Sequence, residues 1–352
     1  MKQRFALLVF TAGFLSGVRA DEAGIVRSEF IFETAPFAQC HASTLAETKG
    51  GLVAAWFGGK REGDPSVGVW LSRLEAGKWT APFEVANGNQ PDGPRMPCWN
   101  PVLFQPKEGP LLLWYKVSRS PQAWWSLQMT SEDGGKTWSP PTKLPEGYLG
   151  PIKSKPIQLR GGDILCPSST ESPERPSQWR IHFERTGDLG KTWSNSAPPA
   201  GEKPIQAIQP NLLVHPAGKL QAVGRTRSGK LFSVFSEDEG TTWGPIGLLD
   251  LPNPNSGTDA GTLKDGRHLL VYNHTFLGRS PLNVALSDDG LRWKAALVLE
   301  DAGGEYSYPS CLQTADNLVH ISYTWKRQRV KHVVLDPSKL TTREIRAGIW
   351  PK

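Results

Sequence analysis

The sequence predicts an all-β protein, a β-propeller of six four-stranded blades. A Ser-x-Asp-x-Gly-x-Thr-Trp turn recurs along the chain, and a second pattern of paired apolar strands occurs six times. A period near 50 residues is typical of a propeller blade rather than of a helical solenoid. The 36 Gly and 30 Pro fit many short strands joined by turns, and no stretch has the pattern of a long amphipathic helix.

The first twenty residues are set apart from this pattern. Lys2 and Arg4 precede an apolar run that ends in Val18-Arg19-Ala20. This is the form of a secretory signal peptide cleaved after Ala20, and the run is short for the alternative, a membrane anchor. We therefore expect a signal peptide at residues 1–20 and a propeller domain at 21–352. The mature protein would be secreted or periplasmic, with no membrane contact.

The charge balance of the mature chain is nearly neutral. Without Lys2, Arg4 and Arg19, the chain keeps 37 Lys and Arg against 34 Asp and Glu, so its net charge is +3 rather than +6. No run of basic residues predicts a nucleic-acid surface.

Four cysteines remain, and their spacing does not resemble a zinc site. An oxidising compartment permits disulfides, and Cys40 and Cys98 occupy similar places in adjacent repeats, so a bond between them is one interpretation. The other is that all four, Cys166 and Cys311 included, are buried free thiols in strands.

The clearest copy of the turn is SEDGGKTW at 131–138. TGDLGKTW at 186–193 and SEDEGTTW at 236–243 repeat it, SDDGLRW at 287–293 is one residue shorter, and SRLEAGKW at 72–79 keeps only Ser, Gly and Trp. The tryptophans of successive copies lie 59, 55, 50 and 50 residues apart. These spacings fix the length of one blade.

The chemistry of this turn is structural. Its Asp can accept hydrogen bonds from backbone N–H groups of its own turn, its Gly permits a positive φ, and its Trp supplies an apolar plug between neighbouring sheets. A calcium loop is the alternative, but each copy offers few oxygen ligands for that ion.

The second repeat has a polar residue, then Pro or Ala, then an apolar strand, a Gly-containing turn and another apolar strand. Its copies begin at His41-Ala42, Asn100-Pro101, Lys155-Pro156, Gln209-Pro210, Asp259-Ala260 and Tyr308-Pro309. Six copies predict six blades. The apolar segment Ile25–Glu33 precedes the first copy, and we expect it to close the ring against the last blade.

The first strand of each blade lines the central channel of a propeller, so its start lies at one mouth of the channel. The six predicted starts place His41, Asn100, Lys155, Gln209, Asp259 and Tyr308 around that mouth. Tolerance of a wet channel would also explain polar residues there.

The ends of the second strands return to the same mouth. They add Lys60 to Asp64, Lys116, Ser168, Arg225 to Arg227, Asn273-His274 and Lys326-Arg327. Carboxylates, histidines, a tyrosine and several cations suit acid–base chemistry on an anionic sugar. Trp99, Trp124 and Trp125 lie in nearby segments, where they stack on sugar rings or pack structurally.

The turns and the strand pattern together resemble the sialidase (neuraminidase) superfamily, particularly its bacterial branch with BNR, or Asp-box, repeats. The resemblance covers nearly all of the mature chain. It implies three arginines that bind the substrate carboxylate, a nucleophilic tyrosine helped by a glutamate, and an aspartate as acid/base. Tyr308 resembles that tyrosine, with Tyr306 as a weaker candidate, and Arg225 resembles one of the arginines. Asp64, or Glu62 beside it, lies where the acid/base loop of blade one belongs.

Three positions depart from the family pattern. Cys40-His41-Ala42 stands where the Arg-Ile-Pro motif is expected, Gln209 replaces the expected glutamate, and no arginine matches clearly near Asp259. A tyrosine without its glutamate is poorly activated, and a site without three arginines binds a carboxylate less tightly.

Three functions therefore compete. The first is an exo-α-sialidase-type glycoside hydrolase, in which Tyr308 attacks, Glu62 or Asp64 carries the proton, and Arg225 with Lys326 or Arg327 binds an acidic group. The second is a lyase-type β-elimination from a uronic acid, with His41 as base, Tyr308 as acid, and Arg225 or Lys155 neutralising the carboxylate. The third is a glycan-binding propeller without turnover. The expected partner in each is an acidic carbohydrate.

The sequence contains no cofactor motif. A Walker loop, a G-x-G-x-x-G after a strand and an HExxH motif are all missing, so we expect neither a cofactor nor a catalytic metal.

Overall fold

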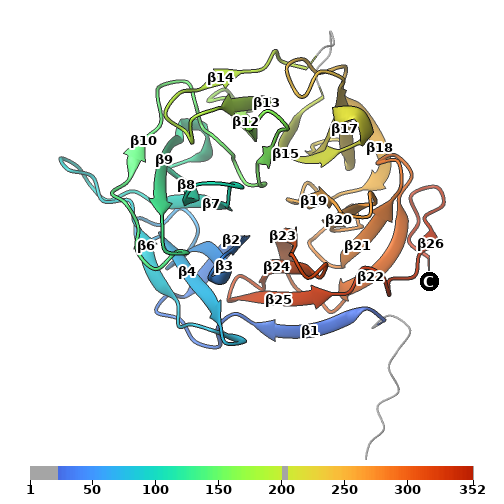
Figure 1. Cartoon of the computed structure of the whole chain (residues 1–352), viewed down its shortest axis with the longest axis horizontal. Coiled ribbons are helices and arrows are strands. Elements are labelled where there is room, and N and C mark those ends of the chain that lie inside the picture. Colours follow the sequence, from blue (N-terminus) through green and yellow to red (C-terminus); the bar gives the residue numbers. More distant parts are fainter. Residues whose placement is uncertain (1–22, 200–204, 352) are drawn as a thin grey trace, which may run out of the picture.

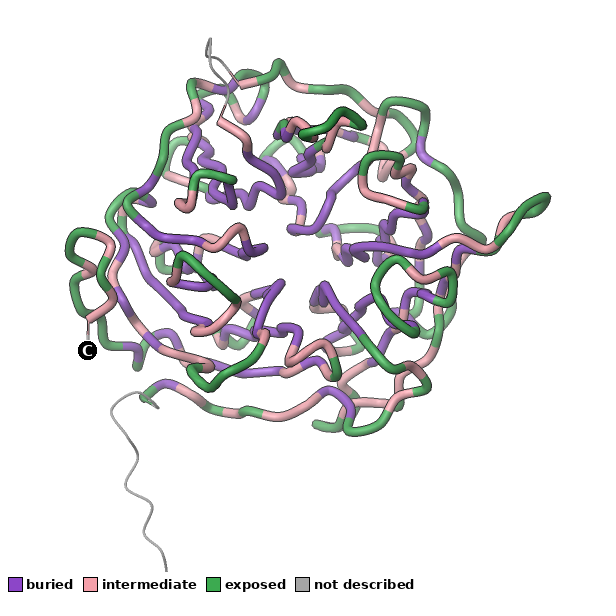
Figure 2. Tube along the Cα trace, turned by 180° about the vertical axis from the view of Figure 1, so that it is seen from behind, coloured by how far each residue is buried: buried purple, intermediate pink, exposed green. Residues whose placement is uncertain are grey.

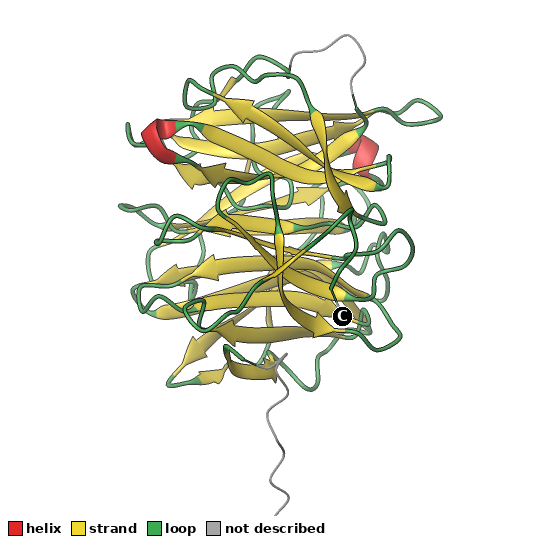
Figure 3. Ribbon diagram, turned by 90° about the vertical axis from the view of Figure 1, so that its right-hand side faces the viewer, coloured by secondary structure: helices red, strands yellow, loops and turns green. Residues whose placement is uncertain are grey.

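The computed structural model describes residues 23–199 and 205–351. Six sheets surround a central axis (Figure 1), and their strands run across the thickness of the disc, so the connecting loops lie at its two faces (Figure 3). The predicted fold, an all-β propeller of six four-stranded blades, is confirmed. The predicted signal peptide lies outside the described residues.

The blades, numbered I to VI, each place their first strand at the centre. Blade I consists of β2 (Gln39–Thr48), β3 (Gly51–Gly59), β4 (Gly68–Glu75), β5 (Lys78–Trp79) and β6 (Phe83–Ala86). Blade II consists of β7 (Cys98–Phe104), β8 (Leu111–Val117), β9 (Trp125–Ser131) and β10 (Thr142–Lys143). Blade III consists of β11 (Ile157–Gln158), β12 (Ile164–Glu171), β13 (Trp179–Thr186) and β14 (Ser194–Asn195). Blade IV consists of β15 (Ala207–Val214), β16 (Leu220–Thr226), β17 (Lys230–Ser236) and β18 (Gly247–Pro252). Blade V consists of β19 (Asp259–Thr262), β20 (His268–Tyr272), β21 (Leu282–Ser287), β22 (Lys294–Glu300) and β26 (Arg343–Glu344). Blade VI consists of β23 (Tyr306–Gln313), β24 (Val319–Trp325), β25 (Arg329–Leu335) and β1 (Ile25–Phe30). Two short 3-10 turns, η2 (Pro121–Ala123) and η3 (Pro216–Gly218), complete the described elements.

The ring is closed by the N-terminal strand, as the sequence predicts. β1 pairs antiparallel with β25 from Ile25 opposite Leu335 to Phe30 opposite Lys331. It is therefore the outermost strand of blade VI, which otherwise consists of C-terminal residues (Figure 1). Closure of this kind ties the two ends of the chain together and covers an otherwise unpaired strand edge.

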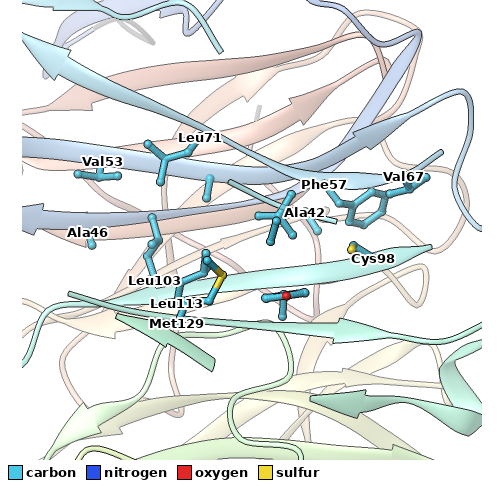
Figure 4. Close-up of a cluster of buried hydrophobic side chains, with 14 of the residues drawn as sticks. Ala42, Ala46, Val53, Phe57, Val67, Leu71, Cys98, Leu103, Leu113 and Met129 are labelled. Atoms are coloured by element: carbon cyan, nitrogen blue, oxygen red, sulfur yellow. The ribbon is translucent and has the colours of Figure 1, made fainter. Parts of the chain in front are cut away.

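The hydrophobic core lies between neighbouring blades. Buried residues follow the inner strands of every blade, whereas exposed residues gather in the loops and at the outer edge (Figure 2). Val53 and Leu71 of blade I face Leu103, Leu113 and Met129 of blade II across one such interface (Figure 4). Each blade thus buries its apolar face against the next, which explains why the repeat must be complete around the ring.

The Asp-box turns have the structural role that the sequence predicts. Asp133 accepts hydrogen bonds from the backbone N–H groups of Lys136 and Thr137, each at 2.9 Å. These bonds, with that of the Thr137 hydroxyl, lower the pKa of the Asp133 carboxyl. The turn follows β9, whose last residue pairs with the first residue of β8. It therefore lies at the face opposite the starts of the first strands.

The tryptophan of each full turn packs on the preceding blade. Trp243 of blade IV stacks on Phe183 of blade III with ring centroids 3.8 Å apart, and Trp193 of blade III meets Trp114 of blade II edge to face. The predicted plug between sheets is confirmed.

The four cysteines, Cys40, Cys98, Cys166 and Cys311, are buried free thiols. Of the two interpretations that the sequence allows, the disulfide between Cys40 and Cys98 is therefore not formed. Burial raises the pKa of each thiol, so these side chains act as small apolar groups in the strands.

Candidate active site

Tyr308 lies where β23 begins, at one mouth of the channel. Its phenol oxygen accepts a hydrogen bond of 2.9 Å from Nη2 of Arg225, which comes from the end of β16 in blade IV. The guanidinium carbons of Arg225 and Arg279 lie 5.4 and 5.5 Å from the centre of the Tyr308 ring. A tyrosine from blade VI is thus held between two cations from blades IV and V.

A β-bulge sets the position of Tyr308, and the same bulge recurs in three other blades. Strand pairing shifts between Ser307 and Ser310, and Tyr308 has a φ of 51°. The equivalent residues in β2, β7 and β15, each with a positive φ, are Ala42, Asn100 and Gln209. The predicted mouth positions of Asn100, Gln209 and Tyr308 therefore correspond to one another, whereas His41 precedes the bulged residue by one position.

Asp259 and Lys155 lie deeper in the channel than the repeat pattern of the sequence predicts. The Asp259 carboxylate of blade V accepts a hydrogen bond of 2.6 Å from the backbone N–H of Cys311 in blade VI. Thr44 Oγ1 of blade I accepts the equivalent bond from the backbone N–H of Leu103 in blade II, so Asp259 and Thr44 occupy equivalent positions in their blades. Since Thr44 lies two residues beyond Ala42, Asp259 lies two residues beyond the mouth position, which is Gly257.

The charge of Asp259 is neutralised at that depth. Lys155 Nζ lies 2.5 Å from the Asp259 carboxylate and 3.1 Å from the hydroxyl of Ser310, so the three tie blades III, V and VI together. Lys155 also lines a cavity with Glu47 and Leu312, near the far ends of their strands. This pair spans the channel instead of facing the mouth beside Tyr308.

Gly257 leaves room for the Tyr308 ring. A Cβ atom at Gly257 would lie 3.1 Å from two carbons of that ring and 3.3 Å from Oε1 of Gln209. Gln209 is buried, and its Oε1 has no hydrogen-bond partner within the part of the chain that the structure describes. An amide therefore stands beside the tyrosine where the family resemblance implies a carboxylate, and an amide cannot take the phenol proton.

His41 packs directly against Tyr308, with ring centroids 4.1 Å apart. Its Nδ1 is 2.8 Å from the hydroxyl of Thr324, and the whole side chain is buried. Burial lowers the pKa of His41 well below its usual range, and the nearby cations Arg327, Arg279 and Arg225 lower it further. The imidazole is therefore held in its neutral form, which keeps one ring nitrogen free of a proton, and the same burial and cations make it a weak base.

A chain of ion pairs connects the remaining charged groups of the mouth. Glu305, directly before β23, accepts hydrogen bonds of 2.7 Å from both Arg279 and Arg327. Arg327 also pairs with Glu62 of the blade I loop. Burial opposes ionisation of Glu305, but Arg327 and Arg279 outweigh it and lower the pKa of the carboxyl. Glu62, Arg327, Glu305 and Arg279 thus form one network around Tyr308.

Asp64, the other acid/base candidate, is engaged in its own turn. Its carboxylate accepts the hydroxyl of Ser66 at 2.7 Å and the Ser66 backbone N–H at 2.9 Å. Both bonds lower the pKa of the Asp64 carboxyl, whose residue is half-buried in the loop. The structure thus brings Glu62 into the mouth network and leaves Asp64 capping the loop that carries Glu62.

Lys326 and His274 are engaged in contacts with residues other than Tyr308. The Lys326 ammonium lies 4.6 Å from the centre of the Trp325 ring, and Trp325 packs on Phe30 of the outermost strand. His274 is fixed between the hydroxyl of Tyr272 at 2.5 Å and the carbonyl of Gly348 at 2.9 Å. These contacts place both residues in the packing of blades V and VI.

Lys153 occupies the mouth position of blade III, where the sequence analysis places Lys155. Its buried ammonium donates hydrogen bonds of 2.5 Å to the carbonyls of Thr258 and Pro309, which directly follow Gly257 and Tyr308. Burial lowers its pKa to about 8, against the raising effect of Asp259. Lys153 therefore ties blades III, V and VI beneath the tyrosine.

Sequence reasoning missed three residues of this site: Arg279, Glu305 and Lys153. Arg279 and Glu305 stand on the loops that enter β21 and β23, where no repeat marks them. One usable signal is the adjacency of Glu305 to Tyr306-Ser307-Tyr308. Lys153 is two residues before Lys155-Pro156, whose proline resembles that of the other copies.

No group of three His, Cys, Asp or Glu side chains within residues 23–199 and 205–351 is arranged to hold a metal ion. The same ranges contain no helix long and apolar enough to span a bilayer.

Six blades, Asp-box turns and a mouth tyrosine among arginines define a sialidase-like propeller. The family model for the BNR repeat-like domain matches residues 50–321. The chain therefore belongs to the BNR repeat-like family. No protein with a curated description matches the chain.

Solved structures show the same fold. A protein of unknown function from Dyadobacter fermentans is 21% identical, with 88% of this chain and 98% of that chain covered and a TM-score of 0.72. The NanB sialidase of Streptococcus pneumoniae is 12% identical over 89% of this chain and 71% of that chain, with a TM-score of 0.70. The intramolecular trans-sialidase of Ruminococcus gnavus is 12% identical over 92% and 99%, with a TM-score of 0.69. Identities this low establish the fold alone.

Proposed function

We propose that this protein is a secreted or periplasmic glycoside hydrolase of the sialidase type, which removes an acidic sugar at the channel mouth. The observation that carries the proposal is the hydrogen bond from Arg225 to the phenol oxygen of Tyr308, with Arg279 beside the same ring. Paired guanidinium groups bind a sugar carboxylate well. In a sugar such as sialic acid, whose anomeric carbon bears the carboxylate, a tyrosine beside these groups would lie next to the anomeric carbon.

In the proposed reaction Tyr308 is the nucleophile. Its oxygen forms a bond to the anomeric carbon while the glycosidic C–O bond breaks, and the leaving oxygen receives a proton from Glu62. Water then cleaves the tyrosyl–sugar bond: its oxygen bonds to the anomeric carbon, its proton goes to the Glu62 carboxylate, and the phenol oxygen regains its proton from His41. Tyrosine nucleophiles of this kind are a known exception among glycosidases.

The phenol proton needs an acceptor, and His41 supplies one. The Gln209 amide beside Tyr308 cannot take a proton, whereas the imidazole of His41 packs on the ring and is held neutral by burial. Arg225 and Arg279 stabilise the negative charge that develops on the oxygen as the proton leaves.

Arg327 links substrate binding to the proton donor. It pairs with both Glu62 and Glu305. A sugar carboxylate that draws Arg327 toward itself weakens the pair with Glu62, so that Glu62 takes up a proton from solvent and passes it to the leaving oxygen. Arg225, Arg279 and Arg327 would be the three carboxylate-binding cations.

The test is the release of aryl alcohol from aryl glycosides of sialic acid and of uronic acids, with wild type and Tyr308→Phe in parallel. We expect release by wild type, and loss of at least about a thousandfold in Tyr308→Phe with its melting temperature unchanged. No release from any of these substrates by the folded protein would remove the proposal.

The second candidate is β-elimination from a uronic acid. The contact between His41 and Tyr308 favours it, because a neutral base and a phenol acid are the two groups that elimination needs. His41 would remove the proton at C5, the C4–O bond would break, and Tyr308 would protonate the leaving oxygen. The unsaturated product absorbs in the ultraviolet, so a rise in absorbance with uronic acid oligosaccharides separates elimination from hydrolysis.

A further inference from the structure

A groove of about 680 Å³ opens on the mouth face between blades II and III. One wall is the connection from β8 to β9, which contains η2 and Trp124. The opposite wall is the end of β12 at Glu171, and the segment 143–149 after β10 closes one end. The groove is therefore a feature of the loops around the mouth and not of the channel itself.

Three aromatic side chains line this groove: Trp124, Trp125 and Tyr148. All three are only half-buried, so part of each ring is available to a ligand. Glu146 and Glu171 add two carboxylates to the lining, against one cation, Lys143, whose Nζ lies 5.6 Å from the centre of the Trp125 ring.

One line of contacts joins the groove to Tyr308 through aromatic rings. Trp124 packs on Trp99 at 5.8 Å between ring centroids, and Trp99 meets Phe57 at 6.2 Å. Phe57 meets His41 at 5.6 Å, and His41 lies against Tyr308. The groove thus begins on the blade II side of the candidate active site.

A second line of contacts reaches the groove from the opposite side. Arg225, which binds the Tyr308 hydroxyl, lies over the Trp179 ring at 5.4 Å. Trp179 Nε1 donates to the carboxylate of Glu171 at 3.2 Å, and Glu171 forms the groove wall. Each wall of the groove is thus connected to Tyr308 through a chain of packed side chains, Trp124 through Trp99, Phe57 and His41, and Glu171 through Trp179 and Arg225.

We propose that this groove binds the neutral sugar residues of a glycan whose acidic terminal residue occupies the mouth. This inference rests on the proposed function for the acidic residue only. The mouth carries Arg225, Arg279 and Arg327, which suit an anion, whereas Glu146 and Glu171 in the groove repel one. Carboxylates accept hydrogen bonds from sugar hydroxyls, and the faces of Trp124 and Trp125 stack on the apolar faces of pyranose rings.

The test is a fluorescence titration of the protein with neutral oligosaccharides, since tryptophans line the groove. The probes are β-galactosyl, β-glucosyl, β-xylosyl and α-mannosyl oligosaccharides of four to six residues, none of which carries an acid. We expect at least one to give a saturable change, and binding about tenfold weaker in Trp124→Ala and Trp125→Ala. Glu146→Arg, at an exposed position, fills the groove without touching the packed rings and should weaken binding equally.

The control is Phe276→Ala, which removes an aromatic ring that is 63% exposed in the loop between β20 and β21 and does not line the groove. It should bind like wild type, and so should Tyr308→Phe. No saturable change with any probe, or equal binding by wild type and all three groove variants, would overturn the inference. An absence of aryl glycoside release by the wild-type protein, with groove binding intact, would overturn only the proposed function.

Discussion

Arg225 and Tyr308, 83 residues apart in the sequence, are joined by a 2.9 Å hydrogen bond from Nη2 to the phenol oxygen. The same guanidinium binds the backbone carbonyl of Asn255 through Nη1 at 2.9 Å. The cation is therefore fixed from both sides before any substrate arrives, and its orientation toward the tyrosine costs no reorganisation during the reaction.

We expect Arg225→Met to lower kcat/KM for aryl glycoside release by about a hundredfold, because a charge-assisted hydrogen bond and a carboxylate-binding cation are lost together. Arg227→Met is the matched control, since Arg227 is exposed and its guanidinium carbon lies 4.2 Å from the centre of the Trp179 ring. Steady-state kinetics of both variants check this. Equal losses in the two variants would mean that general positive charge, rather than the bond to Tyr308, is responsible.

Gly257→Ala tests the space around the tyrosine. A methyl group would lie 3.1 Å from the Tyr308 ring, so the ring must shift by a few tenths of an ångström. We expect kcat/KM to fall at least about tenfold, with a stability cost of about 1 kcal/mol. Gly261→Ala, where a methyl group meets nothing within 4 Å, should leave both unchanged. Kinetics and urea unfolding measure the two effects, and unaltered activity in Gly257→Ala would contradict the packed position of Tyr308.

The fold was predictable because its signals repeat. Each Asp-box turn satisfies its own backbone, and each tryptophan fills the gap to the preceding blade, so the same residues recur about every 50 positions. The closing strand Ile25–Phe30 was predictable for the same reason, since blade VI needed a fourth strand. The disulfide interpretation failed because equivalent places in adjacent blades need not bring two thiols together.

The depth of residues in the channel was only partly predictable. A proline follows the bulged residue in the blades of Asn100, Gln209 and Tyr308, and this dipeptide reveals the bulge. Blade I has Ser43 after its bulged residue, so His41 was placed one residue early. In blade III Pro156 lies directly before β11 and three residues beyond Lys153, which shifted the assignment from Lys153 to Lys155.

The ion-pair network of the mouth had no sequence signal that reveals its partners. Arg327 and Glu62 are 265 residues apart, and Arg279 and Glu305 stand on irregular loops. Only the closed ring brings these loops to one place. The roles of the mouth residues therefore remain proposals that the variants described here can test.

Glu305→Gln should weaken substrate binding more than it slows the reaction. The carboxylate holds Arg279 and Arg327 at 2.7 Å each, and a neutral amide keeps the shape but loses both ion pairs. We expect KM to rise about tenfold with kcat within about threefold of wild type. Glu33→Gln, which removes an exposed ion pair to Arg329 at the outer edge, is the control and should behave as wild type. A fall in kcat with unchanged KM would contradict a positioning role for Glu305.

A histidine pair at the closing strand should make stability depend on pH. His332 of β25 is buried, with Nε2 2.9 Å from Nδ1 of His320 and Nδ1 3.1 Å from the carboxylate of Glu29 on β1. Glu29 also binds Arg27 of its own strand and the indole N–H of Trp79. Burial lowers the pKa of His332 to about 4, which the bond to Glu29 only partly offsets, and burial also lowers the pKa of His320.

Because the folded-state pKa of His332 lies below the unfolded value of about 6.5, the unfolded chain binds more protons between these two values. The free energy of unfolding is therefore highest above about pH 6.5 and falls as the pH falls toward 4. For this histidine the loss at pH 4 is about 3 kcal/mol. Urea unfolding from pH 7.5 to 4.5 should show this loss, and His332→Gln should remove most of it while lowering stability at pH 7.5. An unchanged pH dependence in His332→Gln would contradict the assignment of the effect to the contact between β25 and the closing strand.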